Sequence, residues 1–296
     1  MSGRALVLGG GGVAGIAWMT GVLLGLEDEG VHLRDADVLI GTSAGSTVAA
    51  QIAGDTGLDD LFQWQIDPAR QVAELTPKPH LLELAANALP VLFKLGDTAE
   101  RTRRIGDLAA KTTTVQEAVR REVIAERLPV HDWPARMLKV VAVDIATGEP
   151  RIFDRLSGVD LVDAVAASCA VPGMWPPVSI GNDRYMDGGI RSSDNADLAA
   201  GCGRIVVLSP LGTGGMQLPG GKGLEAQVDG LRNIGSRVLV IEPNEASRKA
   251  IGHNPLSPEA RIPAAEAGRV QGRDEAVSTI SFSTDRTANG QAMPLR

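Results

Sequence analysis

A serine between two glycines is the residue of this sequence whose surroundings most clearly suggest chemistry. It is Ser43 in the stretch Gly41-Thr42-Ser43-Ala44-Gly45, which follows a short apolar run and precedes a helix-forming segment. This pattern, between a strand and a helix, is typical of a nucleophile elbow. Glycine is needed at both flanking positions because side chains there would collide with neighbouring backbone. The alternative is a serine that only caps the helix.

A second glycine motif lies upstream, where Gly10, Gly11, Gly12 and Gly15 follow the apolar run 5–8. Its spacing fits a dinucleotide-binding loop, but that interpretation expects an acidic residue at the end of the second strand, where the serine elbow stands instead. The other interpretation is that consecutive N–H groups of the loop form an oxyanion site. We favour it, because in a parallel βαβ unit this loop lies beside the elbow and one hypothesis then explains both motifs.

A serine nucleophile needs a base, and two candidates remain open from the residues alone. The order Ser43, Asp187, His253 is that of an α/β-hydrolase triad, but only one strand precedes the elbow and His253 is in a polar, turn-like context. The other candidate is Asp187 acting directly, from a turn that Gly188 and Gly189 make possible. Burial would have to raise the pKa of this carboxyl for it to act as a base near neutrality.

The composition predicts an acidic, globular protein. The chain has 296 residues, 44% hydrophobic and 22% charged, with a net charge of −7. Nucleic acid is therefore not expected as a partner. The cysteines, Cys169 and Cys202, are far apart and the four histidines do not cluster, so neither a metal nor another cofactor is expected. We expect no signal peptide or membrane-spanning segment, and a cytoplasmic location, in contact with membrane surfaces at most peripherally.

The hydrophobic pattern predicts alternating strands and helices, and hence an α/β fold: a three-layer sandwich whose central, mostly parallel sheet has helices on both faces. Gly15, Gly21 and Gly25 lie in the first helix and are expected to permit close contact of its backbone with the sheet. Strands are expected at 5–8, 38–40, 138–145 and 151–153 (as a hairpin), up to 186, at 204–210 and at 237–242. Helices are expected at about 14–29, 47–53, 55–65, 68–76, 81–93, 99–110, 115–126, 160–170, 224–234, 245–251 and 257–280.

The expected domain organisation is one catalytic domain, 1–280, followed by a polar tail, 281–296. Residues 55–135 are expected to be a helical insertion between the second and third strands. The stretch 81–93 is the most apolar helical segment. It is predicted to be a core helix or, as the functional alternative, a cover over Ser43.

Together the motifs resemble, in order and spacing, the signatures of patatin-like phospholipases. The resemblance covers roughly residues 5–210 and rests on the stretches 10–15, 41–45, 187–189 and 167–178. It implies a Ser–Asp dyad without histidine, with Ser43 as nucleophile, Asp187 as base and the N–H groups of Gly10, Gly11 and Gly12 as the oxyanion hole. It also implies hydrolysis of acyl esters of lipids, often phospholipids, without a metal.

One position departs from the family pattern. The family usually has Arg or Lys where Ala14 stands. Backbone N–H groups would still form the oxyanion hole, so the departure bears on phospholipid as the substrate more than on hydrolysis. Two other functions stay open at this stage: a nucleotide-binding or regulatory module without serine chemistry, and an acyltransferase that uses the same dyad. Acyl chain length, headgroup and oligomeric state are not predicted.

Overall fold

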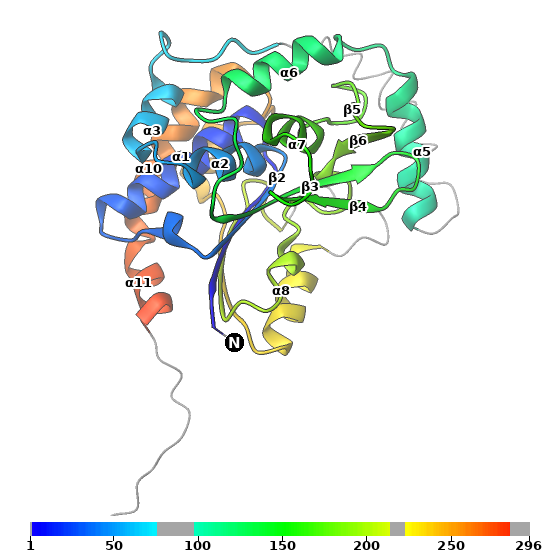
Figure 1. Cartoon of the computed structure of the whole chain (residues 1–296). Helices are drawn as coiled ribbons and strands as arrows, with labels where there is room; N and C mark the ends of the chain where they lie inside the picture. Colours follow the sequence, from blue (N-terminus) through cyan, green and yellow to red (C-terminus); the bar gives the residue numbers. More distant parts are fainter. Residues whose placement is uncertain (1, 76–97, 214–222, 285–296) are drawn as a thin grey trace, which may run out of the picture.

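The computed structural model describes residues 2–75, 98–213 and 223–284, and within them eight strands form one mixed sheet (Figure 1). Seven of the strands follow the order β5-β6-β3-β2-β1-β7-β8, and β4 pairs with β3. The strands are β1 (Arg4–Leu8), β2 (Val38–Thr42), β3 (Met137–Asp144), β4 (Pro150–Phe153), β5 (Val178–Ile180), β6 (Asp183–Asp187), β7 (Arg204–Leu208) and β8 (Arg237–Ile241).

The central strands of this sheet are parallel and the strands on the β3 side are antiparallel. Parallel pairing joins β3, β2, β1, β7 and β8, and antiparallel pairing joins β3 to β4 and β6, and β6 to β5. β1 is buried along nearly its whole length, as the apolar composition of a central parallel strand predicts. Because β1 and β2 are parallel neighbours, the glycine loop and the serine elbow leave the sheet at the same edge.

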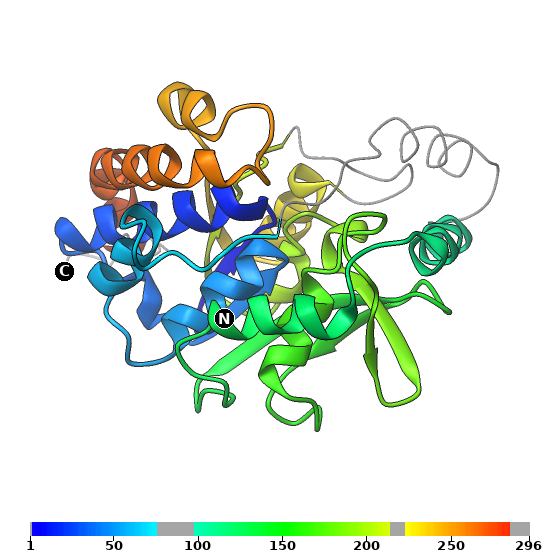
Figure 2. The same ribbon diagram turned by 90° about the horizontal axis from the view of Figure 1, so that it is seen from above.

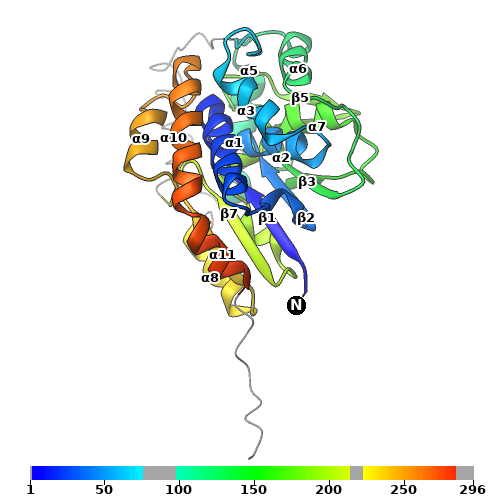
Figure 3. The same cartoon turned by 90° about the vertical axis from the view of Figure 1, so that its left-hand side faces the viewer.

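Helices cover both faces of the sheet, as predicted (Figures 1 and 3). α1, α2 and α7 pack on one face, with α3 and α10 packed on α1, and α8 packs on the other face. The helices are α1 (Gly12–Asp28), α2 (Ala44–Ala53), α3 (Leu58–Ile66), α5 (Thr98–Lys111), α6 (Glu117–Glu126), α7 (Leu161–Ser168), α8 (Leu224–Asn233), α9 (Glu245–Ile251), α10 (Arg261–Asp274) and α11 (Ala276–Thr284). Short 3₁₀ turns are η1 (Leu33–Asp35), η2 (Gly188–Ile190), η3 (Ala196–Ala199) and η4 (Pro258–Ala260).

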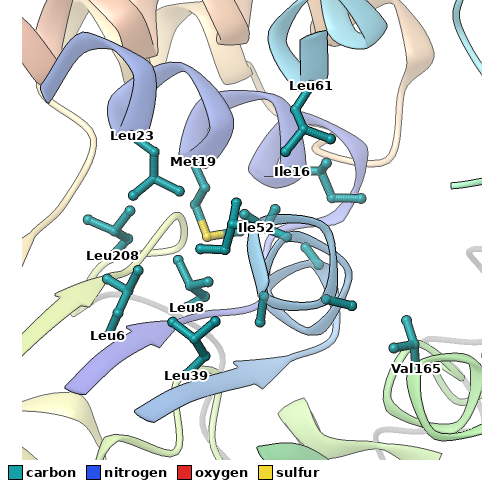
Figure 4. Packing of buried hydrophobic residues seen from close by; sticks show 14 of the residues in the cluster. Leu6, Leu8, Ile16, Met19, Leu23, Leu39, Ile52, Leu61, Val165 and Leu208 are labelled. Atoms are coloured by element: carbon teal, nitrogen blue, oxygen red, sulfur yellow. The ribbon is translucent and has the colours of Figure 1, made fainter. Parts of the chain in front are cut away.

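Alternating strand residues build a core on each face. Leu6, Leu8 and Leu39 point toward Met19 and Leu23 of α1, and all five are almost completely buried (Figure 4). The strand residues that alternate with these leucines pack against α8 on the opposite face of the sheet. The sheet is therefore apolar on both sides, and it holds the loops at its carboxyl edge in fixed positions.

Gly21 and Gly25 of α1 do permit a close backbone approach, but they approach another helix, whereas the prediction was an approach to the sheet. A Cβ atom on Gly21 would lie 2.1 Å from the Ala265 carbonyl oxygen of α10, and one on Gly25 would lie 2.1 Å from that of Arg269. α10 contributes Gly268 and Gly272 to the same contact. The reason is that α1 turns Met19 and Leu23 toward the sheet, while Gly21 and Gly25 face α10.

Two predicted helices differ in the structure. The stretch 68–75 is a turn followed by irregular chain, because its Glu74 carboxylate is buried between Arg127 and Arg261 and this pairing overrides local helix propensity. The stretch 257–280 is divided into η4, α10 and the start of α11. The predicted helix 81–93 lies outside the described residues. β5, only three residues long, was not predicted.

The helix contact through glycines leads to a stability prediction. Gly21→Ala should lower the free energy of unfolding by about 2 kcal/mol, because the added methyl group forces α1 and α10 apart. Gly230→Ala in α8 is the matched control: its Cβ would meet open space, so helix propensity should make it neutral or stabilising by up to ~1 kcal/mol. Chemical denaturation of the two variants measures the difference. Equal stabilities would contradict the close contact.

Candidate active site

Ser43 lies on a strained turn between β2 and α2. Its φ is +52° and its ψ is −119°, a backbone conformation that is rare for a residue with a side chain. A Cβ on Gly41 would be 2.4 Å from the Ser46 Cα, and one on Gly45 would be 1.9 Å from the Leu8 carbonyl oxygen. The expectation that these glycines prevent backbone collisions is confirmed, and Ser43 is held at the carboxyl edge of the sheet.

The end of α7 fixes the backbone of this turn. The Ser43 N–H donates to Ser168 Oγ at 2.9 Å, and that hydroxyl donates to the Val141 carbonyl at 2.6 Å. The Cys169 thiol, whose pKa is raised by burial, lies 3.3 Å from the Ser43 carbonyl oxygen and donates to it. Sequence reasoning gave Ser168 and Cys169 no role, although both lie in the stretch 167–178 that carries the family resemblance.

The Asp187 carboxyl is buried beside Ser43. The backbone N–H of Asp187 donates to the Ala170 carbonyl, and Oδ1 of its side chain accepts the Gly189 N–H at 2.7 Å. Burial raises the pKa of Asp187 to about 6, while the Ser43 hydroxyl, the Gly189 N–H and the Arg120 guanidinium favour the ionised form. Oδ2 accepts no hydrogen bond of ordinary geometry from a described residue, although the Ser43 hydroxyl is close enough to stabilise the ionised carboxyl. A carboxyl in this state is suited to proton transfer near neutral pH.

Asn195 connects the two catalytic candidates. Its side-chain amide donates to Thr42 Oγ1 at 3.0 Å and to the Gly188 carbonyl at 3.3 Å, so it joins the residue before Ser43 to the residue after Asp187. It is fully buried, and its φ of +52° is one that asparagine tolerates better than most residues. Sequence analysis missed Asn195, and its place in a polar loop offered no signal beyond that tolerance.

The glycine loop has two free donors. The Gly10 N–H donates to the Ser193 carbonyl at 2.8 Å, so it is occupied in this structure. Gly11 and Gly12 carry N–H groups that make no hydrogen bond to any described residue. A Cβ on Gly10 would lie 3.6 Å from the Ser43 Cβ, so the loop and the elbow are neighbours. A Cβ on Gly15 would lie 3.3 Å from the Pro210 Cβ, so the absence of a side chain lets the base of the loop pack against Pro210.

A narrow pocket of about 30 Å³ opens beside Ser43, with room for one or two water-sized groups. Its walls include Gly12 of the loop, Arg120 of α6, Trp175 after α7, and Leu256, which follows α9. Figure 2 looks down on this end of the molecule, where the stretch after α3, in cyan, crosses the top of the helical layer. The pocket therefore combines segments that are far apart in the sequence.

None of the three described histidines is brought to Asp187. His253 is exposed in the loop after α9, and neither it nor His32 nor His131 makes a hydrogen bond to Ser43 or Asp187; His80 lies outside the described residues. In the described ranges there is no group of three or more His, Cys, Asp or Glu side chains able to hold a metal ion. No helix in this part of the chain has both the length and the apolar character needed to cross a membrane.

Comparisons with known proteins confirm the predicted resemblance. The patatin-like phospholipase family matches residues 6–200, well over half of the chain, and the protein belongs to that family. No curated protein gives a significant match. Among solved structures, VipD from Legionella pneumophila aligns with 14% identity and a TM-score of 0.46, over 94% of this chain and 67% of VipD. The type III effector protein ExoU aligns with 18% identity and a TM-score of 0.40, over 94% of this chain and 53% of ExoU.

The raised pKa of Asp187 leads to a prediction for stability. Between about pH 4 and pH 6 the folded protein retains a proton on Asp187 that the unfolded chain releases, so stability falls as pH rises through this range. Asp187→Asn should therefore raise the free energy of unfolding at pH 7 by up to ~3 kcal/mol and change it little at pH 4. Denaturation at both pH values tests this, with the exposed Asp274→Asn as control. A destabilised Asp187→Asn protein at pH 7 would contradict it.

Proposed function

We propose that this protein is a serine acyl hydrolase that cleaves carboxylic esters of lipids, with Ser43 as nucleophile and Asp187 as base. The observation that carries the proposal is the adjacency of the Ser43 hydroxyl to a buried carboxyl whose pKa is raised to about 6. Membership of the patatin-like phospholipase family supports the class of reaction. The catalytic unit of the proposal is one domain, 1–280, with the insertion 55–135.

The proposed reaction passes through an acyl-enzyme. Ser43 Oγ attacks the ester carbonyl carbon while its proton passes to Asp187, and the N–H groups of Gly11 and Gly12 bind the oxyanion. The tetrahedral intermediate collapses as Asp187 returns the proton to the leaving alcohol. A water molecule then attacks the acyl-enzyme, again giving its proton to Asp187, and the carboxylic acid leaves as Ser43 is regenerated.

The surroundings of Asp187 support a base without histidine. An exposed carboxylate, with a pKa near 4, is a weak base at pH 7, whereas a pKa of about 6 lies closer to the working pH. The hydrogen bonds of Ser43 to Ser168 and Cys169 use its backbone and not its side chain. The lipid surface itself would be met peripherally, from the carboxyl edge of the sheet where Ser43 lies.

The role of Ser43 is tested by covalent labelling. A fluorophosphonate should label the wild-type protein and not Ser43→Ala, which should also lose ester hydrolysis, because the only proposed nucleophile is gone. Ser278→Ala is the control: among the described residues this exposed hydroxyl in α11 bonds to Glu275 alone, and its loss should leave labelling unchanged. Folded wild-type protein that hydrolyses no ester and stays unlabelled would overturn the proposal.

The role of Asp187 is tested by rate and pH dependence. Asp187→Asn should lower kcat by at least ~10², the usual contribution of a positioned base. The kcat of the wild type should rise as pH increases through about 6 and then level off, because only the ionised carboxyl accepts the proton. His253→Ala should have a rate close to that of the wild type. The opposite pattern, a silent Asp187→Asn and an inactive His253→Ala, would indicate a histidine base.

A further inference from the structure

Arg120, in α6, is a buried cation, and two of its three guanidinium nitrogens find no acceptor among the described residues. The residue is only 6% exposed, and its Nε and Nη1 are shielded from bulk water with no acceptor among the described residues. The Trp175 ring lies over the guanidinium of Arg120, with 4.0 Å between the ring centroid and Cζ. Burying a charged group without hydrogen bonds is costly. An acceptor carried by a ligand would reduce this cost, and Arg120 is one of the residues that line the pocket beside Ser43.

The carboxylates near Arg120 are already engaged. Both oxygens of Glu74 are taken, one by Arg127 and the other by Arg261. Asp187 directs Oδ1 to the Gly189 N–H, and it attracts Arg120 without bonding to it. Burial, followed by the nearby Arg127, lowers the pKa of Arg120 to about 10, so it stays charged at neutral pH. Three arginines thus face two carboxylates here, and Arg120 is the one for which no carboxylate of the described residues accepts a hydrogen bond.

Arg120 lines the same pocket as Ser43 but approaches from the side opposite the glycine loop. β2, which ends at the elbow, lies between β1, which leads into the glycine loop, and β3. On the β3 side are α7, which packs on β3, and Trp175, the ring that Arg120 contacts. A carbonyl oxygen directed at Gly11 and Gly12 is therefore turned away from Arg120. The guanidinium would meet a different part of the same substrate.

The glycine loop itself offers no cation. Ala14, where the family usually has Arg or Lys, is completely buried in the core, and its N–H donates to the Pro255 carbonyl at 2.9 Å. Positive charge in the pocket comes from α6 and not from the loop. A guanidinium suits the oxygens of a phosphate, because it donates charge-assisted hydrogen bonds to them.

We propose that Arg120 recognises a phosphate group on the substrate, so that the preferred substrates are acyl esters carrying a phosphate close to the scissile ester. This inference rests on the proposed function, because it assigns a specificity residue to the site of Ser43. A free phosphate ion has the same oxygens, and the binding experiment below separates it from a lipid phosphate.

The first experiment measures a ratio. It compares kcat/KM for 1-hexanoylglycerol 3-phosphate with that for 1-hexanoylglycerol, two monomeric esters that differ only in the phosphate. The wild type should prefer the phosphate ester by about tenfold or more, since a charge-assisted hydrogen bond is at stake. Arg120→Gln should bring the ratio close to one, mainly through the KM of the phosphate ester. Because Arg120 also acts on Asp187, the ratio and not either rate is the readout.

Two variants serve as controls. Arg120→Lys keeps the charge without the planar fork and should retain part of the preference. Arg121→Gln removes a charge from the next position of α6, where the exposed side chain pairs with Asp163, and should keep the wild-type ratio. A wild-type ratio near one, or an undiminished ratio in Arg120→Gln, would overturn the inference while leaving ester hydrolysis itself intact.

The second experiment does not depend on hydrolysis. Titration calorimetry with hexyl phosphate should show binding to the wild type and at least about tenfold weaker binding to Arg120→Gln. Inorganic phosphate should bind the wild type much more weakly than hexyl phosphate. Equal affinities of the two proteins for hexyl phosphate, or of the wild type for the two phosphates, would overturn the inference. If neither ester is hydrolysed, the proposed function fails and this titration still decides the role of Arg120.

Discussion

The site depends on one backbone constraint: a residue with a side chain is held at φ +52° in a sharp turn between β2 and α2. Such a conformation costs roughly 1–3 kcal/mol and persists only when its surroundings determine it completely. Here the surroundings are the parallel pairing of β1 with β2, the approach of Gly45 to the Leu8 carbonyl, and the hydroxyl of Ser168. Removal of any of these supports would release the turn that presents the Ser43 side chain.

Burial of charge is the second property that shapes the site. Asp187, Glu74 and Arg120 are all withdrawn from water, and only Glu74 has both oxygens in ion pairs. Hydrogen bonding and charge keep the pKa of Asp187 at about 6 rather than higher. The fold thus tolerates an unfavourable carboxyl at neutral pH, which agrees with the proton-transfer role proposed for Asp187.

The part of the chain beyond residue 200, where the family match ends, also contributes to the site. Pro210 packs against Gly11 and Gly15, and Leu256 forms part of the pocket wall over Gly12. Arg261, at the start of α10, pairs with Glu74. α10 then packs along α1 through glycines of both helices, so the helix that follows the glycine loop is held from its outer side.

The sequence by itself determined the α/β fold, most of the elements, and the three motifs that meet at the carboxyl edge of the sheet. It could do so because a strained turn, a glycine loop and an Asp-Gly-Gly turn each need particular residues at adjacent positions, and such requirements are visible locally. Only the tertiary structure decided that glycines of α1 face α10 and that Asn195 joins the two catalytic candidates. It also decided that the chain around Glu74 is irregular, where a helix was predicted. It also placed Arg120 in the pocket, although along the sequence this arginine is one charge among many in a polar helix. Each of these depends on partners tens to hundreds of residues away, which no local pattern records.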